Sequence, residues 1–197
     1  MRVREMLTYL ATALPRFTSP ASRLIALQCA LRADTHGRVR LPPGLLRSMR
    51  LRGRAEVWEE LVHGYWLRPP DLRSTPVKVQ LLDATVRDQA PGRAARRQAA
   101  HWALRPEPLE LRGAAPEAVR LVALALAAHM SPDAAYAIDV DVLARLCGHS
   151  FHQTAELLDR LVVTHTLASW HHDRDTGEVS WQLVHPGSRS NPGLWTL

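Results

Sequence analysis

The chain has 197 residues, of which 46% are hydrophobic and 22% charged, which is the composition of an ordinary globular protein. No apolar run approaches the roughly 20 residues needed to span a bilayer, so the sequence excludes the membrane-spanning class and predicts no membrane partner. The formal net charge of +6 is uneven, because residues 1–113 carry 20 Lys and Arg against 10 Asp and Glu, whereas residues 114–197 carry 5 against 9. The two halves are therefore expected to contact different partners.

The N-terminal stretch, residues 1–19, is predicted to contain an amphipathic helix. Glu5, Thr8 and Tyr9 interrupt its apolar residues, and a Pro-Arg pair follows in place of the small-residue cleavage site of a signal peptide. We expect this helix to belong to the mature protein.

Residues 20–88 are predicted to form three helices and a β-hairpin. The elements are a helix from about Arg23 to Ala33, a short helix opened by Pro42 and Pro43, a helix from about Arg54 to His63, and strands at 65–67 and 77–82. Ser22 is the predicted cap of the first helix, and Gly64 ends the third. A proline is compatible with the start of a helix because the first-turn amides have no partner inside the helix.

Residues 114–186 are predicted to repeat this order after a basic linker at 89–113 that contains a helix. The elements are a helix from Pro116 to His129, a second from Asp139, a third from Phe151 to about Thr164, and strands at 167–172 and 178–184. Ser150 is the predicted cap of the third helix, and Asp175-Thr176-Gly177 is a strong turn signal between the strands. Residues 187–197 are a C-terminal tail.

Three blocks of these two segments match each other in the same order. Residues 23–27 match residues 120–124, residues 41–49 match 138–146, and residues 55–62 match 155–162. The offset is 97 residues in the first two pairs and 100 in the third, and the extra residues fall where a turn is expected. The blocks indicate an internal duplication.

In element order and apolar spacing, residues 20–85 and 115–185 resemble the winged helix-turn-helix superfamily of DNA-binding proteins. The resemblance implies an α+β fold, mainly α with small β-hairpins, made of two tandem winged-helix modules related by duplication. It also implies that the third helix of each module is a recognition helix for the major groove and that each hairpin is a wing. The Arg- and Ala-rich composition is similar to that of proteins from GC-rich bacterial genomes.

Basic residues gather at the expected DNA-contacting end of the first module. Guanidinium groups suit bidentate contacts with phosphate and with guanine edges. The predicted binding residues for double-stranded DNA are Arg47, Arg50, Arg52, Arg54 and Ala55 at the turn, Arg68, Arg73 and Lys78 in the wing, and Arg93, Arg96 and Arg97 on one face of the linker helix. Two alternatives stay open: the charges form a solvated face, or the linker helix packs through Ala99, Trp102 and Leu104.

The second module offers a nearly neutral surface at the equivalent places. Its third helix carries Ser150, His152, Gln153, Thr154, Glu156 and Arg160, with Asp159 beside them. Its wing tip, residues 171–175, contains two acids, and phosphate would repel each exposed acid by about 1 kcal/mol at close range. The sequence predicts that this module serves dimerisation, effector binding or contact with a protein partner.

Motifs of enzymes are absent from the sequence, which has no glycine-rich phosphate loop, no Gly-x-Ser-x-Gly elbow and no His-Glu-x-x-His. No catalytic residue and no cofactor are predicted, and Glu59-Glu60 is interpreted as an exposed helix face. The best candidate for a metal site is the group Cys147, His149, His152, His171 and His172. It lacks the regularly spaced pairs of Cys or His ligands that are typical of structural zinc sites, so no metal is predicted.

The two cysteines and six tryptophans are predicted core residues. Cys29 and Cys147 lie on apolar stripes of predicted helices, which suits a reducing cytosol better than a disulfide framework. Core packing is favoured over base stacking for the tryptophans, which are Trp58, Trp66, Trp102, Trp170, Trp181 and Trp195.

The sequence therefore predicts a cytoplasmic protein, associated with the nucleoid when bound, that recognises specific double-stranded DNA sequences as a transcriptional regulator without catalysis. A homodimer is predicted because paired half-sites multiply affinity. Two alternatives stay open: a protein of plasmid or chromosome replication or maintenance, and a tandem winged-helix adaptor that binds other proteins.

Overall fold

The computed structural model describes residues 3–83, 93–109, 111, 114–130 and 136–184, with only the backbone of Arg93. The fold is mixed α+β, about 50% helical, with small antiparallel sheets. Within these ranges, no helix is long and apolar enough to cross a membrane.

Two segments of the chain show the same order of elements. Helix α1 (Val3–Ala13) precedes the first segment, residues 20–83, which contains α2 (Pro20–Arg32), β1 (Arg38–Leu41), α3 (Pro43–Ser48), α4 (Ala55–His63) and β2 (Val77–Gln80). Helix α6 (Arg93–Trp102) leads to the second segment, residues 114–184, which contains α7 (Glu117–His129), β3 (Ala137–Asp139), α8 (Val140–Cys147), α9 (Phe151–Val163), β4 (Leu167–His172) and β5 (Glu178–Leu183). The predicted helices are confirmed, and each segment also has a strand after its first helix that the sequence did not predict.

Helix α2 is capped by Ser19, so the prediction of Ser22 as its cap is wrong. The Ser19 hydroxyl accepts a hydrogen bond from the Ser22 amide, and Pro20 fits the first helical position, where its missing N–H would have no partner. Ser22 is fully buried, and its hydroxyl donates to the Val57 carbonyl at 3.0 Å. The helix begins earlier than predicted because proline can open it.

The predicted starts of α8 and α9 are confirmed. The Asp139 carboxylate accepts from the amide of Val142 at 2.9 Å. Ser150 and Gln153 form a reciprocal capping box, in which each side chain accepts from the backbone amide of the other. These side chains satisfy amides that would otherwise lack partners at the helix ends.

The two sheets are antiparallel and differ in size. Strand β1 pairs with β2, and the second sheet has the order β3-β5-β4. The hairpin of β4 and β5 confirms the predicted strands and turn, in which Gly177 takes a left-handed φ of 72°. Strands β1 and β3 are short and lie between helices, where four and three residues give little alternation to detect.

The predicted strand at residues 65–67 is reduced to a single bridge between Leu67 and Leu81. Tyr65 has a left-handed φ of 54°, and the Trp66 amide donates back to Leu61 to close the end of α4. These residues belong to the helix end, so extended pairing begins only at Leu67.

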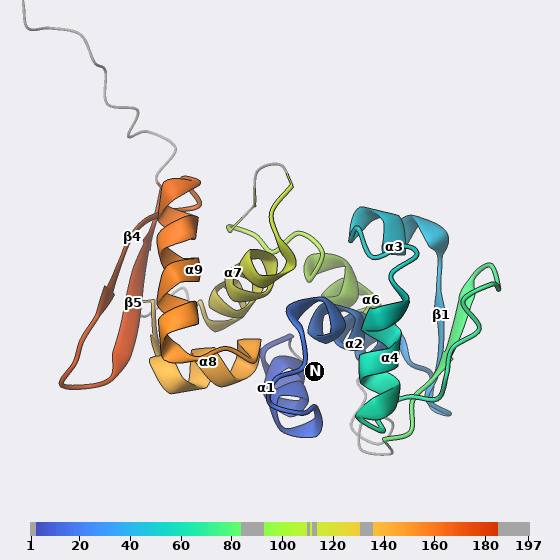
Figure 1. Ribbon diagram of the computed structural model, residues 1–197. Helices are drawn as coiled ribbons and strands as arrows, with labels where there is room; N and C mark the ends of the chain where they lie inside the picture. Colours follow the sequence, from blue (N-terminus) through green and yellow to red (C-terminus); the bar gives the residue numbers. More distant parts are fainter. Residues whose placement is uncertain (1–2, 84–92, 110, 112–113, 131–135, 185–197) are drawn as a thin grey trace, which may run out of the picture.

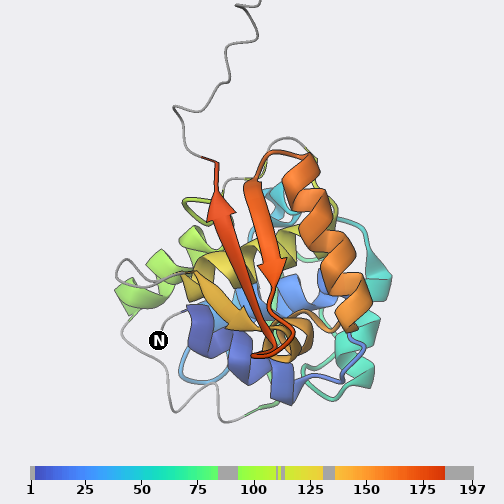
Figure 2. The ribbon, with the colours of Figure 1, turned by 90° about the vertical axis from the view of Figure 1, so that its left-hand side faces the viewer.

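Helices α2 and α7 lie in the middle of the fold, with α4, β1 and β2 on one side and α8, α9, β4 and β5 on the other (Figure 1). Figure 2 shows β4 and β5 on the outer surface of the second segment, with α9 alongside. Helix α1 packs against α2, α7 and α8, and the buried residues of both segments join it in one continuous hydrophobic cluster. The central helices α2 and α7 are buried on nearly all faces, as expected at such a position.

Matching arginines of the two segments reach across their junction. Arg120 of α7 donates from Nη1 to the Met49 carbonyl at the end of α3, at 3.0 Å. Arg23 of α2 lies against Gly148 at the end of α8, where a Cβ would meet the Arg23 Nε at 2.6 Å. The guanidinium of Arg23 is held by the carbonyls of residues 15, 16 and 18. Each central helix therefore supports the turn of the other segment.

The cysteines are free and buried, which confirms them as core thiols. Burial raises the pKa of Cys29 and of Cys147 to about 12. The predicted packing of the tryptophans is confirmed for those described, since Trp58, Trp66 and Trp181 are buried and Trp102 and Trp170 half-buried. Trp195 lies outside the described residues.

Candidate nucleic-acid interface

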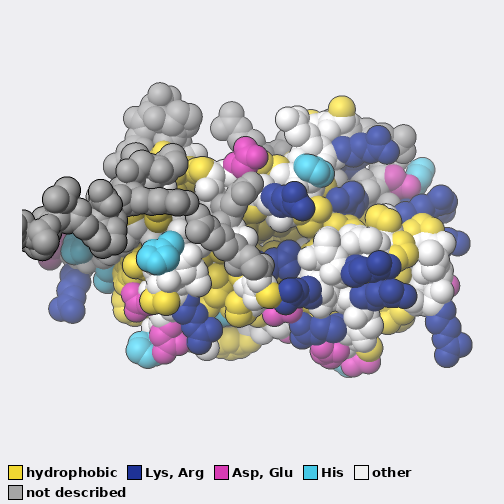
Figure 3. Space-filling model, turned by 90° about the horizontal axis from the view of Figure 1, so that it is seen from above, with side chains coloured by type: hydrophobic (Ala, Val, Ile, Leu, Met, Phe, Trp, Pro, Cys, Tyr) yellow, Lys and Arg dark blue, Asp and Glu magenta, His cyan; other side chains and the backbone are white. Residues whose placement is uncertain are grey.

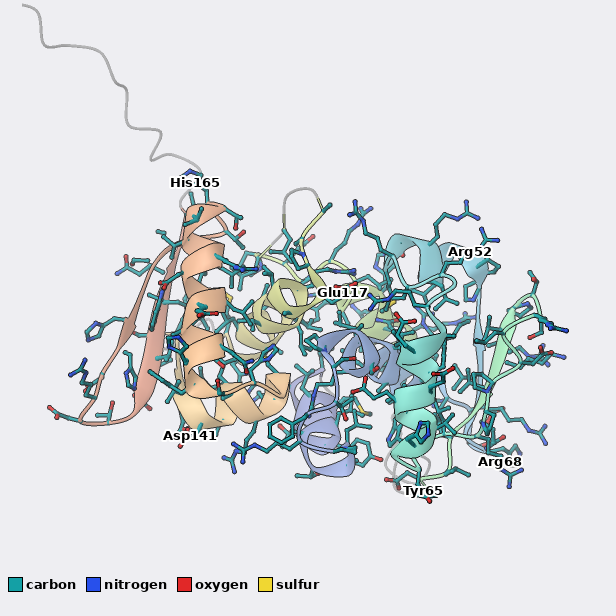
Figure 4. The ribbon with its side chains drawn as sticks, viewed as in Figure 1. Arg52, Tyr65, Arg68, Glu117, Asp141 and His165 are labelled. Atoms are coloured by element: carbon teal, nitrogen blue, oxygen red, sulfur yellow. The ribbon has the colours of Figure 1, made fainter. Side chains whose placement is uncertain are left out.

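The last turn of α3 and the loop between α3 and α4 present three exposed arginines, which we call the turn cluster: Arg47, Arg50 and Arg52. Met49 and Leu51, on either side of Arg50, are 1% and 0% exposed and fix the turn in the core. Figure 4 shows Arg52 at the outer edge of the fold, pointing away from it. Within the described residues, no member of the cluster forms an ion pair with a carboxylate.

Arg50 occupies a backbone position that favours glycine. Its φ is 60°, and a left-handed conformation costs about 1–2 kcal/mol for residues with a Cβ. The amides of Arg50 and Leu51 close the end of α3 by donating back three and five residues. The amides of Gly148 and His149 make the same two bonds at the end of α8, where the left-handed residue is a glycine with φ of 71°.

Arg54, the fourth predicted contact at this turn, is engaged in ion pairs. Its Nε lies 2.6 Å from a Glu56 carboxylate oxygen and its Nη1 lies 2.7 Å from one of Glu117. The hydrogen bond that Arg54 donates to the Glu56 carboxylate raises the pKa of Arg54 and lowers the pKa of Glu56. Sequence reasoning missed this role because Glu117 is far away along the chain, at the start of α7.

The outward face of α4 is acidic after its first residue. Ala55, Glu56, Glu59 and His63 are exposed along it. Glu60 is not part of this face, which corrects the interpretation of Glu59-Glu60 as an exposed pair. Its carboxylate accepts from the amide and hydroxyl of Ser19, at 2.7 and 2.6 Å, and from the hydroxyl of Ser22. Glu60 therefore anchors the start of α2 to α4.

The β1–β2 sheet and the loop before β2 add more exposed cations than the sequence predicted. The predicted residues Arg68, Arg73 and Lys78 are all exposed. Lys78 lies opposite Arg40 in the register of β1 and β2, and Arg38 and Arg40 are both on the exposed face of β1. The alternation Arg-Val-Arg-Leu at 38–41 is the local signal of this face, but four residues are too few to predict a strand.

The predicted basic face of the linker helix divides in the structure. Arg97 is exposed, whereas Arg96 is half-buried and donates to the Ala33 carbonyl at the end of α2. The side chain of Arg93 lies outside the described residues. Ala99, Trp102 and Leu104 pack against the core, as one of the two interpretations predicted. The helix also exposes a cation, Arg97, on its outer side.

The second segment has paired or neutral groups at the equivalent places. On α9, the His152 Nε2 lies 3.3 Å from a Glu156 oxygen, and Asp159 accepts from the Trp170 indole N–H at 2.8 Å. Thr154 is fully buried and donates to the Ser150 carbonyl, so it is not available on the surface. The exposed part of α9 therefore carries two acids and one arginine, Arg160, and no cluster of cations.

The residues of the candidate metal site considered in the sequence do not form a site in the structure. Cys147 is 0% exposed, whereas the His152 side chain is 86% exposed. Among the residues that the structure describes, no three His, Cys, Asp or Glu side chains are arranged to hold a metal ion.

Seen from above, the half of the molecule that holds the first segment displays many more Lys and Arg side chains than the other half (Figure 3). This distribution follows the charge difference between residues 1–113 and 114–197 of the sequence. Comparison with protein-family models, with curated proteins and with solved structures finds no match to this chain.

Proposed function

We propose that the two segments are tandem winged-helix modules and that the protein binds specific double-stranded DNA sequences through the first of them, as a transcriptional regulator. The observation that carries the proposal is the turn cluster, because Arg47, Arg50 and Arg52 are exposed, lack carboxylate partners among the described residues, and lie at the N-terminal end of α4. That end of a third helix is the part that enters the major groove in helix-turn-helix proteins.

The repeated backbone pattern supports the assignment of two modules. In both segments a helix, a strand, two helices and pairing β structure follow in order. The third helices also end alike, since Tyr65 and His165 have left-handed φ values of 54° and 53° and donate to the carbonyls of Val62 and Val162. A shared ancestry of the two segments accounts for these coincidences.

In the proposed complex, each side chain of the turn has a distinct task. The turn cluster neutralises phosphates, which supplies most of the affinity. Ala55 permits close approach at the start of α4, and Glu56 accepts from a cytosine amino group. Arg54 holds Glu56 and ties the turn to α7, so we assign it a positioning role in place of the direct DNA contact expected from sequence.

The wing and the second module complete the proposal. Arg68, Arg73 and Lys78 reach phosphates beside the recognition site or the adjacent minor groove. The second module, whose equivalent surface is neutral or internally paired, contacts a protein partner or a second copy of the chain.

The proposal is tested by selecting bound fragments from random duplex DNA and measuring affinity for them by fluorescence anisotropy. The variant Arg47→Ala/Arg50→Ala/Arg52→Ala is compared with Arg145→Ala/Arg160→Ala/Arg174→Ala, which removes the same charge from exposed positions of the second segment. We expect an enriched motif, at least a hundredfold loss in the first variant only, and a salt slope smaller by about 2.7 because three phosphate contacts are lost. Absence of an enriched motif, or equal losses in both variants, would contradict the proposal.

A protein-binding adaptor is a second candidate, favoured by the exposed Glu56 and Glu59 on the outward face of α4. These carboxylates would be repelled by phosphate but suit a basic protein surface. An adaptor would bind its partner with little dependence on the turn cluster, whereas DNA affinity would fall steeply with salt.

A further inference from the structure

Five arginines from three elements line one pocket of about 560 Å³ between the first segment and α6. They are Arg32 at the end of α2, Arg38 and Arg40 on β1, and Arg96 and Arg97 on α6, and we call the site the arginine pocket. Leu31, Ala33 and Asp34 complete its lining. A volume of this size lies within the range of roughly 300–1,000 Å³ that is typical of small-molecule sites.

The fold brings like charges together at this pocket. Arg38 and Arg40 alternate with buried residues and so share one face of β1, and Arg40 lies opposite the exposed Lys78 of β2. Like charges directly opposite each other destabilise a strand pair. Burial lowers the pKa of the Arg32 guanidinium, and the charge of Arg97 acts in the same direction. The arrangement is therefore electrostatically unfavourable when no anion is bound.

The lining residues do not neutralise this charge. Asp34 is the only carboxylate among them, and its Oδ1 accepts from the amides of His36 and Arg38, both at 2.8 Å. Within the described residues, none of the five arginines forms an ion pair. The Nε of Arg96 is buried without a hydrogen-bond partner, while its Nη1 is fixed on the Ala33 carbonyl. A buried donor without a partner is unfavourable, and an anion bound beside Arg96 could supply the missing acceptor.

We propose that the arginine pocket binds a small polyphosphate, that is, an anion with two or more linked phosphate groups. Guanidinium groups bind phosphate oxygens through two parallel hydrogen bonds, and five of them offer more donors than one phosphate can accept. A chain of phosphates, with several negative charges at a spacing of a few ångströms, matches both the number of arginines and their distribution over three elements. The inference goes beyond DNA recognition and does not depend on it.

Inorganic tripolyphosphate is the probe for the test, titrated into the full chain by isothermal calorimetry at about 0.15 M salt, where surface charges are screened beyond roughly 8 Å. We expect one equivalent to bind and Arg40→Ala/Arg97→Ala to weaken binding at least tenfold. Both side chains are exposed, so this variant is expected to fold, which circular dichroism checks. The matched control Arg160→Ala/Arg174→Ala removes the same charge elsewhere and should change affinity less than twofold.

Two further arms decide what the pocket recognises. Arg40→Lys/Arg97→Lys keeps the charge but removes the planar guanidinium groups. An affinity for tripolyphosphate between that of the wild type and that of the alanine variant would support bidentate recognition. Equal weakening in the Arg160 and Arg174 control would overturn the proposal, because binding would then be general charge attraction. Loss of tripolyphosphate binding when the protein is first saturated with duplex DNA would also overturn it, because the pocket would then hold backbone phosphates.

Discussion

The turn after α3 and the turn after α8 end their helices with the same two amide hydrogen bonds and a left-handed residue, yet they lie in opposite surroundings. In the second segment this residue is Gly148, packed against the buried guanidinium of Arg23. In the first segment it is Arg50, which is exposed. One turn is therefore an interior joint that requires glycine, whereas the other is a surface that retains a charged side chain at a conformational cost.

The helices that follow these turns extend the same contrast. On α9, acids are paired locally, as Glu156 is with His152 and Asp159 with Trp170. On the first segment and α6, the turn cluster and the arginine pocket gather cations without carboxylate partners among the described residues. The two segments therefore place side chains on similar helix ends, but clusters of unpaired cations occur in the half of the chain that is expected to bind anions.

The largest expected effect comes from adding a methyl group to the interior turn. In Gly148→Ala, the new Cβ would lie 2.6 Å from the Arg23 Nε and 3.0 Å from the Arg16 carbonyl oxygen, in addition to the left-handed strain. We expect the free energy of unfolding in urea to fall by about 3 kcal/mol, the sum of strain and overpacking.

Gly53→Ala is the matched control for this change. Gly53 also has a left-handed φ, of 80°, but a Cβ there would meet nothing within 4 Å. It should cost only about 1 kcal/mol, from backbone strain. Equal losses in the two variants would show that the turn after α8 is not the constrained joint that the contacts indicate.

A smaller effect of opposite sign is expected at the matching position of the first segment. Arg50→Gly should raise the free energy of unfolding by about 0.5–1 kcal/mol, because relief of the left-handed strain exceeds the added entropy of the unfolded chain. Arg50→Ala keeps the strain and should give no such gain. Both variants should lose DNA affinity to the same extent in anisotropy measurements, which would separate the role of the charge from that of the backbone. A destabilised Arg50→Gly would contradict the contrast between the turns.

Sequence periodicity was sufficient to predict the helices because most have an apolar face and several have recognisable end signals. Ser150 could be predicted as a cap and Asp139 as the start of a helix, since their side chains act on amides a few residues away. Ser22 could not be assigned correctly, because its burial depends on Val57 and Glu60 of a different helix. Local signals predict local hydrogen bonds, and contacts between elements need the fold.

The same distinction applies to the candidate site. The arginines at the turn were predictable from their clustering, but the partner of Arg54 was not, since Glu117 lies on the first helix of the other segment. The arginine pocket combines residues from α2, β1 and α6 that are distant in sequence. Its detection required strand β1, whose four residues gave too short a pattern to be recognised as a strand.

The smallest expected effect concerns two aspartates that play the same part in the two segments. The Asp34 carboxylate accepts from the amides of His36 and Arg38 in the turn before β1, and the Asp173 carboxylate accepts from those of Asp175 and Thr176 between β4 and β5. Hydrogen bonds from backbone amides lower the pKa of Asp173. At Asp34, desolvation is the largest single effect and raises the pKa, but the hydrogen bonds from the amides of Arg38 and His36 and the charges of these residues together outweigh it, so that the pKa is lowered too. Both turns therefore favour the ionised carboxylate.

Because both groups are easier to ionise in the folded chain, their contribution to stability is present above the ordinary aspartate pKa of about 3.9 and is lost as pH falls through the lowered values. Carboxyl chemical shifts followed by NMR should titrate below that ordinary value at both positions. Urea unfolding between about pH 5 and pH 2 should show a smaller loss of stability on acidification for Asp34→Asn and for Asp173→Asn than for the wild type, since neither amide titrates. If only one variant lost its acid sensitivity, the two carboxylates would differ in the strength of the hydrogen bonds that they accept in the folded chain.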